Sequence, residues 1–392
     1  MKSLAGYVAE IARIEQDIAD IGEAALSVPE DTERLTKYVY RRYQKAAISG
    51  DLRALAGVEA LIDRAIPLLA NPGDLYLLKA NLAFKFHRLA DVGAALASVE
   101  AMYDSRECRM IRADLDFQHG RYEEAKRAYC DVLDAEQTWD GLARLAHFNF
   151  KMGDAEGADR LYAEAEDLLT AKQMRSYAWL EVQRGLLDFM QGRYDQARDH
   201  YDHAEAAYPG YWLVGEHVAE LLGAQGRHGE AAAILERVAA AVDRPDLEQA
   251  LGELYDLKGD AEIAHFWKQK ALAAYLQSAQ DGHVHFYHHL ADYYVDVAED
   301  GAEAVKWARM DLGLRENFST QSALAWALHR DGKMSEALCW IDRALSSGAV
   351  EAKLFFQAGA IYMASGDEAG GRTLAERARS LNPTVDHFHI HH

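Results

Sequence analysis

Apolar residues recur along this chain with helical spacing. Near the amino end, aliphatic side chains repeat every three or four positions and polar residues fill the positions between them. This pattern predicts an amphipathic helix over residues 4–26 that ends before Pro29. The stripe consists of Leu4, Val8, Ile11, Ile14, Ile18 and Ile21. Similar stripes follow along the chain, so we expect an all-α protein with essentially no strand.

A ruler of small residues repeats about every 34 positions and predicts that these helices form pairs. Each glycine of the ruler has one small residue seven positions before it and another five positions after it, as Gly120 has Ala113 and Ala125. Glycine tolerates the left-handed backbone that ends a helix, and small residues let two crossing helices approach closely. Such pairs cannot bury their apolar faces alone, so they stack into a solenoid. The ruler glycines are Gly120, Gly153, Gly192, Gly226, Gly259, Gly332 and Gly366.

The pattern resembles the tetratricopeptide repeat family. One unit contains Gly-Arg-Tyr at 192–194 and then Ala197, Tyr201, Ala204 and Pro209, and another contains Gly-Arg-Tyr at 120–122 and then Ala125 and Tyr129. The last unit has Gly366, Ala378 and Asn382-Pro383. Two departures are Lys268, which stands where an aromatic residue is usual, and the mostly missing early aromatic of the first helix. The resemblance implies an α-α superhelix that binds polypeptides in its concave groove and has no catalytic role.

We expect one continuous superhelical domain of about ten helix-turn-helix units. Residues 1–31 form a capping helix, residues 32–105 two degenerate repeats, residues 106–383 clear repeats, and residues 384–392 a histidine-rich tail. Gly259 and Gly332 are 73 positions apart, which equals two repeat periods plus about five residues. This spacing predicts that one repeat without a ruler glycine, a disguised repeat, lies between them over about 283–317. Its small residues are Ala291 and Ala304.

Composition narrows the function. The formal net charge is −21, which disfavours nucleic acid and favours basic partners, although acidity also keeps an alanine-rich solenoid soluble. The three scattered cysteines fit packing in a reducing, cytoplasmic setting. No apolar run is long enough for membrane insertion. The sequence has no Gly-rich phosphate loop, His-Glu-x-x-His pair or Gly-x-Ser-x-Gly elbow, so no enzyme activity is expected.

The register of the ruler predicts a binding groove. With the small residue before each glycine at position 8 of the first helix, the family resemblance implies that positions 2, 5, 6 and 9 face the concave side. The sequence lacks the Lys, Asn and Arg clamp by which some family members hold a peptide carboxylate. It has acids, a glutamine and histidines there instead, which predicts a basic or extended polypeptide partner. The predicted groove residues are Glu216, His217, Glu220, Gln249, Glu253, His288 and Asp292. The alternative is that exposed positions of an acidic protein are acidic by chance.

Histidines suggest a second hypothesis, a metal-responsive or metal-handling protein. Four imidazoles lie within residues 283–289, and the tail is also rich in histidine. If helical, His285 and His289 lie one turn apart with Asp292 close by, which suits a divalent transition metal. The predicted ligands are His283, His285, His289, Asp292, His387 and His389. The alternatives are packing of these rings against neighbouring tyrosines and a pH-responsive contact.

Overall fold

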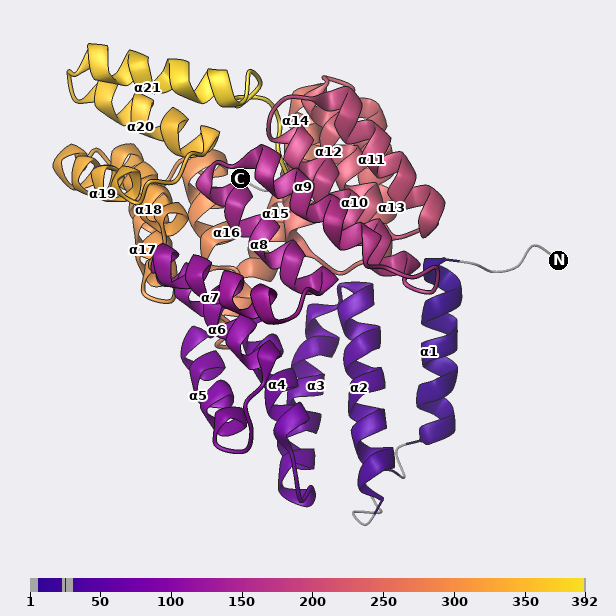
Figure 1. The fold of residues 1–392 in the computed structure, drawn as a ribbon. Coiled ribbons are helices and arrows are strands. Elements are labelled where there is room, and N and C mark those ends of the chain that lie inside the picture. Colours follow the sequence, from indigo (N-terminus) through magenta and orange to yellow (C-terminus); the bar gives the residue numbers. More distant parts are fainter. Residues whose placement is uncertain (1–5, 23–24, 26–30, 391–392) are drawn as a thin grey trace.

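The computed structural model describes residues 6–22, 25 and 31–390, and this part of the chain is helical throughout its length (Figure 1). It contains 21 α-helices, and no strand occurs among the described residues. The expected all-α fold is therefore confirmed. The predicted capping helix is α1 (Tyr7–Ile21), while residues 4–5, residues 23–24 and Pro29 lie outside the described residues.

The remaining twenty helices form ten antiparallel pairs, the number that the sequence predicts. The first five pairs are α2 (Thr32–Ser49) with α3 (Leu52–Ala65), α4 (Gly73–Lys85) with α5 (Leu89–Glu100), α6 (Arg106–Gln118) with α7 (Tyr122–Ala135), α8 (Trp139–Met152) with α9 (Ala155–Asp167), and α10 (Met174–Phe189) with α11 (Tyr194–Ala207). The last five are α12 (Trp212–Ala224) with α13 (His228–Ala241), α14 (Pro245–Lys258) with α15 (Ala261–Gln280), α16 (Tyr287–Asp292) with α17 (Gly301–Leu312), α18 (Phe318–Arg330) with α19 (Met334–Ser346), and α20 (Ala352–Ala364) with α21 (Glu368–Leu381).

The small-residue ruler marks the places where the paired helices cross. All seven ruler glycines have positive φ, from 71° at Gly192 to 98° at Gly366, so each ends the first helix of its pair in a left-handed turn. Gly185 on α10 shows how close the helices lie, because a Cβ built there would be 2.3 Å from the ring of Tyr201 on α11. Ala197, twelve residues after Gly185, is fully buried in the same crossing.

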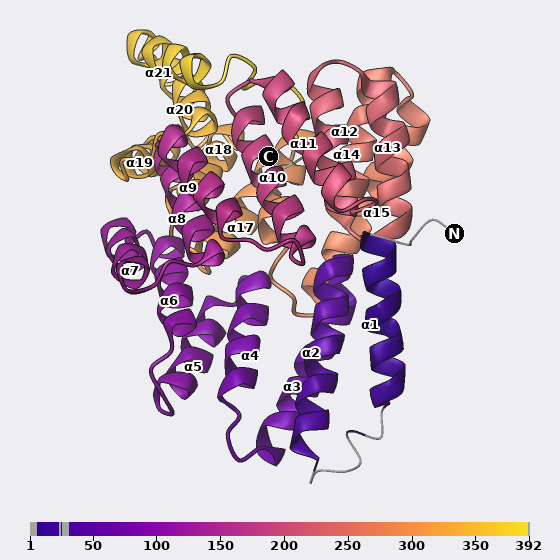
Figure 2. The ribbon, with the colours of Figure 1, turned by 45° about the vertical axis from the view of Figure 1, so that its right-hand side comes forward.

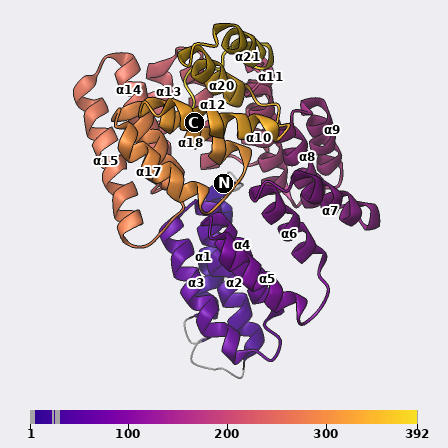
Figure 3. The same cartoon turned by 90° about the vertical axis from the view of Figure 1, so that its left-hand side faces the viewer.

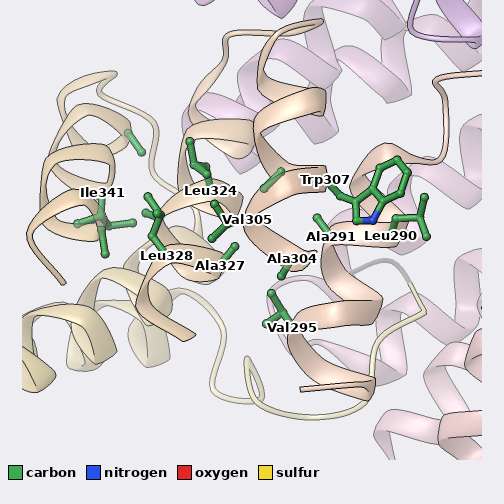
Figure 4. Packing of buried hydrophobic residues seen from close by; sticks show 14 of the residues in the cluster. Leu290, Ala291, Val295, Ala304, Val305, Trp307, Leu324, Ala327, Leu328 and Ile341 are labelled. Atoms are coloured by element: carbon green, nitrogen blue, oxygen red, sulfur yellow. The ribbon is translucent and has the colours of Figure 1, made fainter. Parts of the chain in front are cut away.

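The disguised repeat follows the same plan with one additional residue. Ala291 and Ala304 are both buried, but they stand thirteen residues apart instead of twelve (Figure 4). The helix α16 continues into a π-helix over Tyr293–Val297, whose wider turn accommodates the extra residue. Glu299, with φ 53°, takes the place of the ruler glycine, which explains why this turn is hard to see in the sequence.

Successive turns of the superhelix touch each other. Hydrogen bonds join residues 196 to 200 positions apart, which corresponds to about six pairs per turn. Lys151 Nζ lies 2.9 Å from Glu351 Oε1, and Tyr208 donates a hydrogen bond of 2.7 Å to Glu10. Figures 1 and 2 show α1–α5 at the bottom and the later helices winding above them. In Figure 3, α14, α15 and α17 lie on one side and α6–α9 on the other, with α20 and α21 across the top.

Candidate binding cavity and inner face

One cavity lies on the inner side of the amino-terminal half. It has a volume of about 520 Å³ and is lined mainly by residues of the first helices α4, α6, α8 and α10, which follow one another in Figure 2. Tyr129 on α7 and Tyr162 on α9 complete the lining. This volume is in the range of pockets that hold small molecules or a few side chains of a peptide. Four of the lining residues, Asp140, Ala143, Arg144 and His147, occupy positions 2, 5, 6 and 9 of α8 when Ala146 is position 8. The predicted register is therefore correct for this helix.

Aromatic rings form much of the cavity wall. Trp139 on α8 and Trp179 on α10 meet edge to face with their ring centroids 6.4 Å apart. Phe117 on α6 packs against His147 at 6.3 Å. The side chain of His147 is exposed and lines the cavity. The wall thus offers apolar, half-buried surface on three successive repeats.

A few charged side chains line the cavity together with the aromatic rings. Arg144 forms an ion pair with Asp114, and the Tyr129 hydroxyl donates a hydrogen bond of 2.7 Å to the same carboxylate. Lys85 and Asp140 also line the cavity. Two cationic and two anionic side chains therefore face the space, and the cavity has no strong preference for one sign of charge.

The predicted acidic strip lies further along the chain and is not open to solvent. Glu216, His217, Glu220 and Gln249 are buried, and Glu253 is half-buried. Gln249 donates a hydrogen bond of 3.0 Å to Glu253 and accepts one of 3.2 Å from Tyr275. The expectation that these residues form an exposed strip is wrong, because each carboxylate or amide has partners inside the chain. Their role in binding stays a prediction.

The C-terminal tail covers part of this inner face. The backbone N–H of Ile390 donates a hydrogen bond of 2.8 Å to Glu220, and Ile390 is 5% exposed. Phe388 packs beside Gly223 on α12, where a Cβ would be 2.4 Å from its ring. The sequence pattern of the tail, with alternating apolar residues, contains this signal, but its docking site lies about 170 residues away.

The predicted metal ligands are dispersed. His285 precedes α16, which begins at Tyr287, so His285 and His289 are not one helical turn apart. His285 packs on Phe286, with ring centroids 4.0 Å apart, and His289 stacks on Tyr275 at 5.5 Å. His283 is exposed, and Asp292, in the last turn of α16, is half-buried.

The tail histidines lie at a different place, against α10 and α12. His387 Nδ1 is 2.9 Å from the Ala224 carbonyl, and His389 Nδ1 is 3.9 Å from Glu220. Within the described part of the chain, no three of the predicted ligands bring their donor atoms within 4.8 Å of one another. The structure therefore does not assemble the predicted site. The predicted groove residue His288 does belong to such a group, with His87 and Asp311, and this group was not foreseen from the sequence.

No family profile matches the sequence, and neither does any curated protein sequence. Solved structures similar to this chain include a tetratricopeptide repeat protein from Parabacteroides merdae ATCC 43184, at 17% identity and a TM-score of 0.42, which covers 62% of this chain and 93% of that chain. Another is the APC/C hetero-tetramer Cut9–Hcn1, at 13% identity and a TM-score of 0.43, covering 89% of this chain and 75% of that chain. A third is yeast Tom70, at 11% identity and a TM-score of 0.43, covering 94% of this chain and 92% of that chain.

The geometry of the repeated helix pairs identifies the fold. Ten antiparallel pairs cross at small residues and turn at positive φ in the described residues. The fold is an all-α, tetratricopeptide-like superhelix. None of its described helices has the length and apolar character needed to cross a membrane.

Proposed function

We propose that this tetratricopeptide-like superhelix is a non-catalytic interaction scaffold that binds an extended segment of a protein partner. The contact surface is the cavity of α4, α6, α8 and α10. The observation that supports this most is the aromatic wall of the cavity, because rigid aromatic rings anchor partner side chains at low entropic cost. An extended segment suits a cavity that runs across several parallel first helices.

The cavity also suggests what the segment contains. Trp139 and Trp179 offer a surface for one apolar side chain, and the fixed charges of Arg144 and Asp114 already neutralise each other. Lys85 and Asp140 remain to contact polar groups of the segment at the cavity edge. We therefore expect an apolar anchor with polar flanks. The balanced charge of the cavity gives no reason for a strongly basic partner at this site.

Affinity capture from native lysate, followed by mass spectrometry, tests the proposal. The wild type is compared with the variant Trp139→Ala/Trp179→Ala and with the control Trp340→Ala, which removes a tryptophan from α19, outside the cavity. Peptides that tile the captured partner are then titrated against each protein by fluorescence. We expect one partner segment to lose at least tenfold in affinity with the double variant and to keep its affinity with the control. Equal binding by the double variant, with an unchanged circular-dichroism spectrum, would contradict the proposal.

A further inference from the structure

The residue that connects α4 to α5 has the backbone conformation that the clear repeats give to glycine. His87 has φ 56°, compared with 73° for Gly120 and 96° for Gly153 at the matching turns. A left-handed backbone costs a residue with a side chain about 1 kcal/mol or more. Glycine would therefore be the less strained residue at this turn.

His87 meets two residues from a repeat that lies one superhelical turn away. Its ring is 5.3 Å from the ring of His288 on α16, measured between centroids. One donor atom each from His87, His288 and Asp311 on α17 lies within 4.8 Å of the others. Three points so spaced lie within about 2.8 Å of a common centre, and metal–ligand bonds to nitrogen and oxygen are about 2.1 Å long. Each side chain would therefore have to move by less than about 1 Å to hold one ion.

Each of the two histidine rings has one nitrogen without a hydrogen-bond partner in the described part of the chain. Nδ1 of His87 and Nδ1 of His288 are both buried and have no hydrogen-bond partner among the described residues. A buried nitrogen without a partner is costly, so a ligand at this point would remove the cost.

Asp311 completes the set with a carboxylate that is already oriented. It is 2% exposed, and Arg315 holds both of its oxygens, through Nε at 3.1 Å and Nη2 at 2.8 Å. Each carboxylate oxygen has a second lone pair, so Arg315 can orient the group while an ion binds. A cavity of about 220 Å³, lined by His288, Asp311 and Arg315 among others, lies beside the group and offers room for a water as fourth ligand.

We propose that His87, His288 and Asp311 form a binding site for a divalent transition metal, Zn²⁺ foremost. Two imidazoles and one carboxylate with an open fourth position are a donor set that zinc accepts in tetrahedral geometry. Because the ligands come from the second and the eighth helix pair, the ion joins two turns of the superhelix. Metal binding then stabilises the closed arrangement by mass action. The site is independent of the cavity proposed for the partner segment.

Calorimetric titration of the chelator-stripped full chain with Zn²⁺ tests the site. We expect one ion per chain, a higher melting temperature in the presence of Zn²⁺, and a Co²⁺ absorption spectrum typical of tetrahedral coordination. His288→Ala and Asp311→Asn are expected to lower the affinity at least tenfold. The control His283→Ala, at an exposed histidine outside the group, is expected to keep it.

His87→Gly separates metal binding from folding. Glycine relieves the left-handed backbone at this turn, so the metal-free variant is expected to fold at least as well as the wild type. It should, however, lose the Zn²⁺-dependent rise in melting temperature. The proposal is overturned if the stripped wild type binds no Zn²⁺. It is also overturned if His87→Gly binds the ion as tightly as the wild type, or if only loss of His387 and His389 abolishes uptake.

Discussion

Filling the helix crossing at Gly185 is expected to destabilise the superhelix measurably. An alanine Cβ at this position would lie 2.3 Å, 2.7 Å and 3.0 Å from three ring carbons of Tyr201. Ordinary contact begins near 3.4 Å, so the ring or the helix has to move by about 1 Å. Tyr201 is fully buried and its ring stacks on His217 at 5.8 Å, which leaves little freedom to move. Overpacking of this kind costs about 1–3 kcal/mol.

A second glycine separates the packing cost from helix propensity. Gly57 lies inside α3, and a Cβ there would meet nothing within 4 Å. Gly57→Ala should therefore raise the free energy of unfolding by about 0.8–1 kcal/mol through propensity alone. Gly185→Ala makes the same propensity gain, so the difference between the two variants isolates the crossing, and we expect it to be about 1–3 kcal/mol. Urea unfolding followed by circular dichroism measures both. Equal midpoints for the two variants would refute the close approach at the ruler positions.

Three further predictions concern buried charge, pH and the tail. Glu216→Lys puts a second cation near the half-buried Arg244, whose pKa is raised by Asp246 and Glu216, and should cost about 3–5 kcal/mol in thermal unfolding. The control Glu230→Lys breaks only an exposed ion pair with Arg227 in the first turn of α13 and should lower the melting temperature far less. His285 is buried and its pKa is lowered to about 4, so it binds fewer protons folded than unfolded. The free energy of unfolding should accordingly fall as the pH is lowered from about 6.5 towards 4, and His285→Gln should flatten this profile in urea titrations. Ile390→Ala should weaken tail docking by about 2–4 kcal/mol and increase the binding of a hydrophobic dye, and a matching increase for the exposed control Asp386→Ala would contradict this.

The sequence predicts the fold well because the repeat is a local feature. Whether Ala197 can pack in a crossing depends on the residues of one pair, and these are close in sequence. Ala291 and Ala304 lie in one helix pair, but the π-helix that sets them one residue further apart than in the other pairs leaves no clear sequence signal. A left-handed Glu299 in place of glycine hides this turn further.

The candidate sites were harder to predict because they depend on contacts between distant repeats. The register correctly identifies the inner positions of α8, such as Arg144 and His147. The register does not indicate which inner positions are covered by another turn of the superhelix or by the tail. Glu220, for example, is covered by Ile390 of the tail. For the same reason, spacing within residues 283–289 did not indicate that His288 lies beside His87, which is 201 positions earlier in the sequence.

Contact between successive turns changes how this protein should unfold. An open solenoid has only neighbours in sequence, so its ends can fray independently of its middle. Here Asn317 donates a hydrogen bond of 2.9 Å to Gln118, and the backbone N–H of Phe318 donates one of 2.8 Å to Tyr122. The ninth helix pair therefore contacts the third. Loss of an early pair removes support from a late one, which favours cooperative unfolding of the whole array. The same contacts close loops of about 200 residues, whose entropy must be lost before the contacts form. Folding should therefore be slower than the local helix pairs alone would suggest.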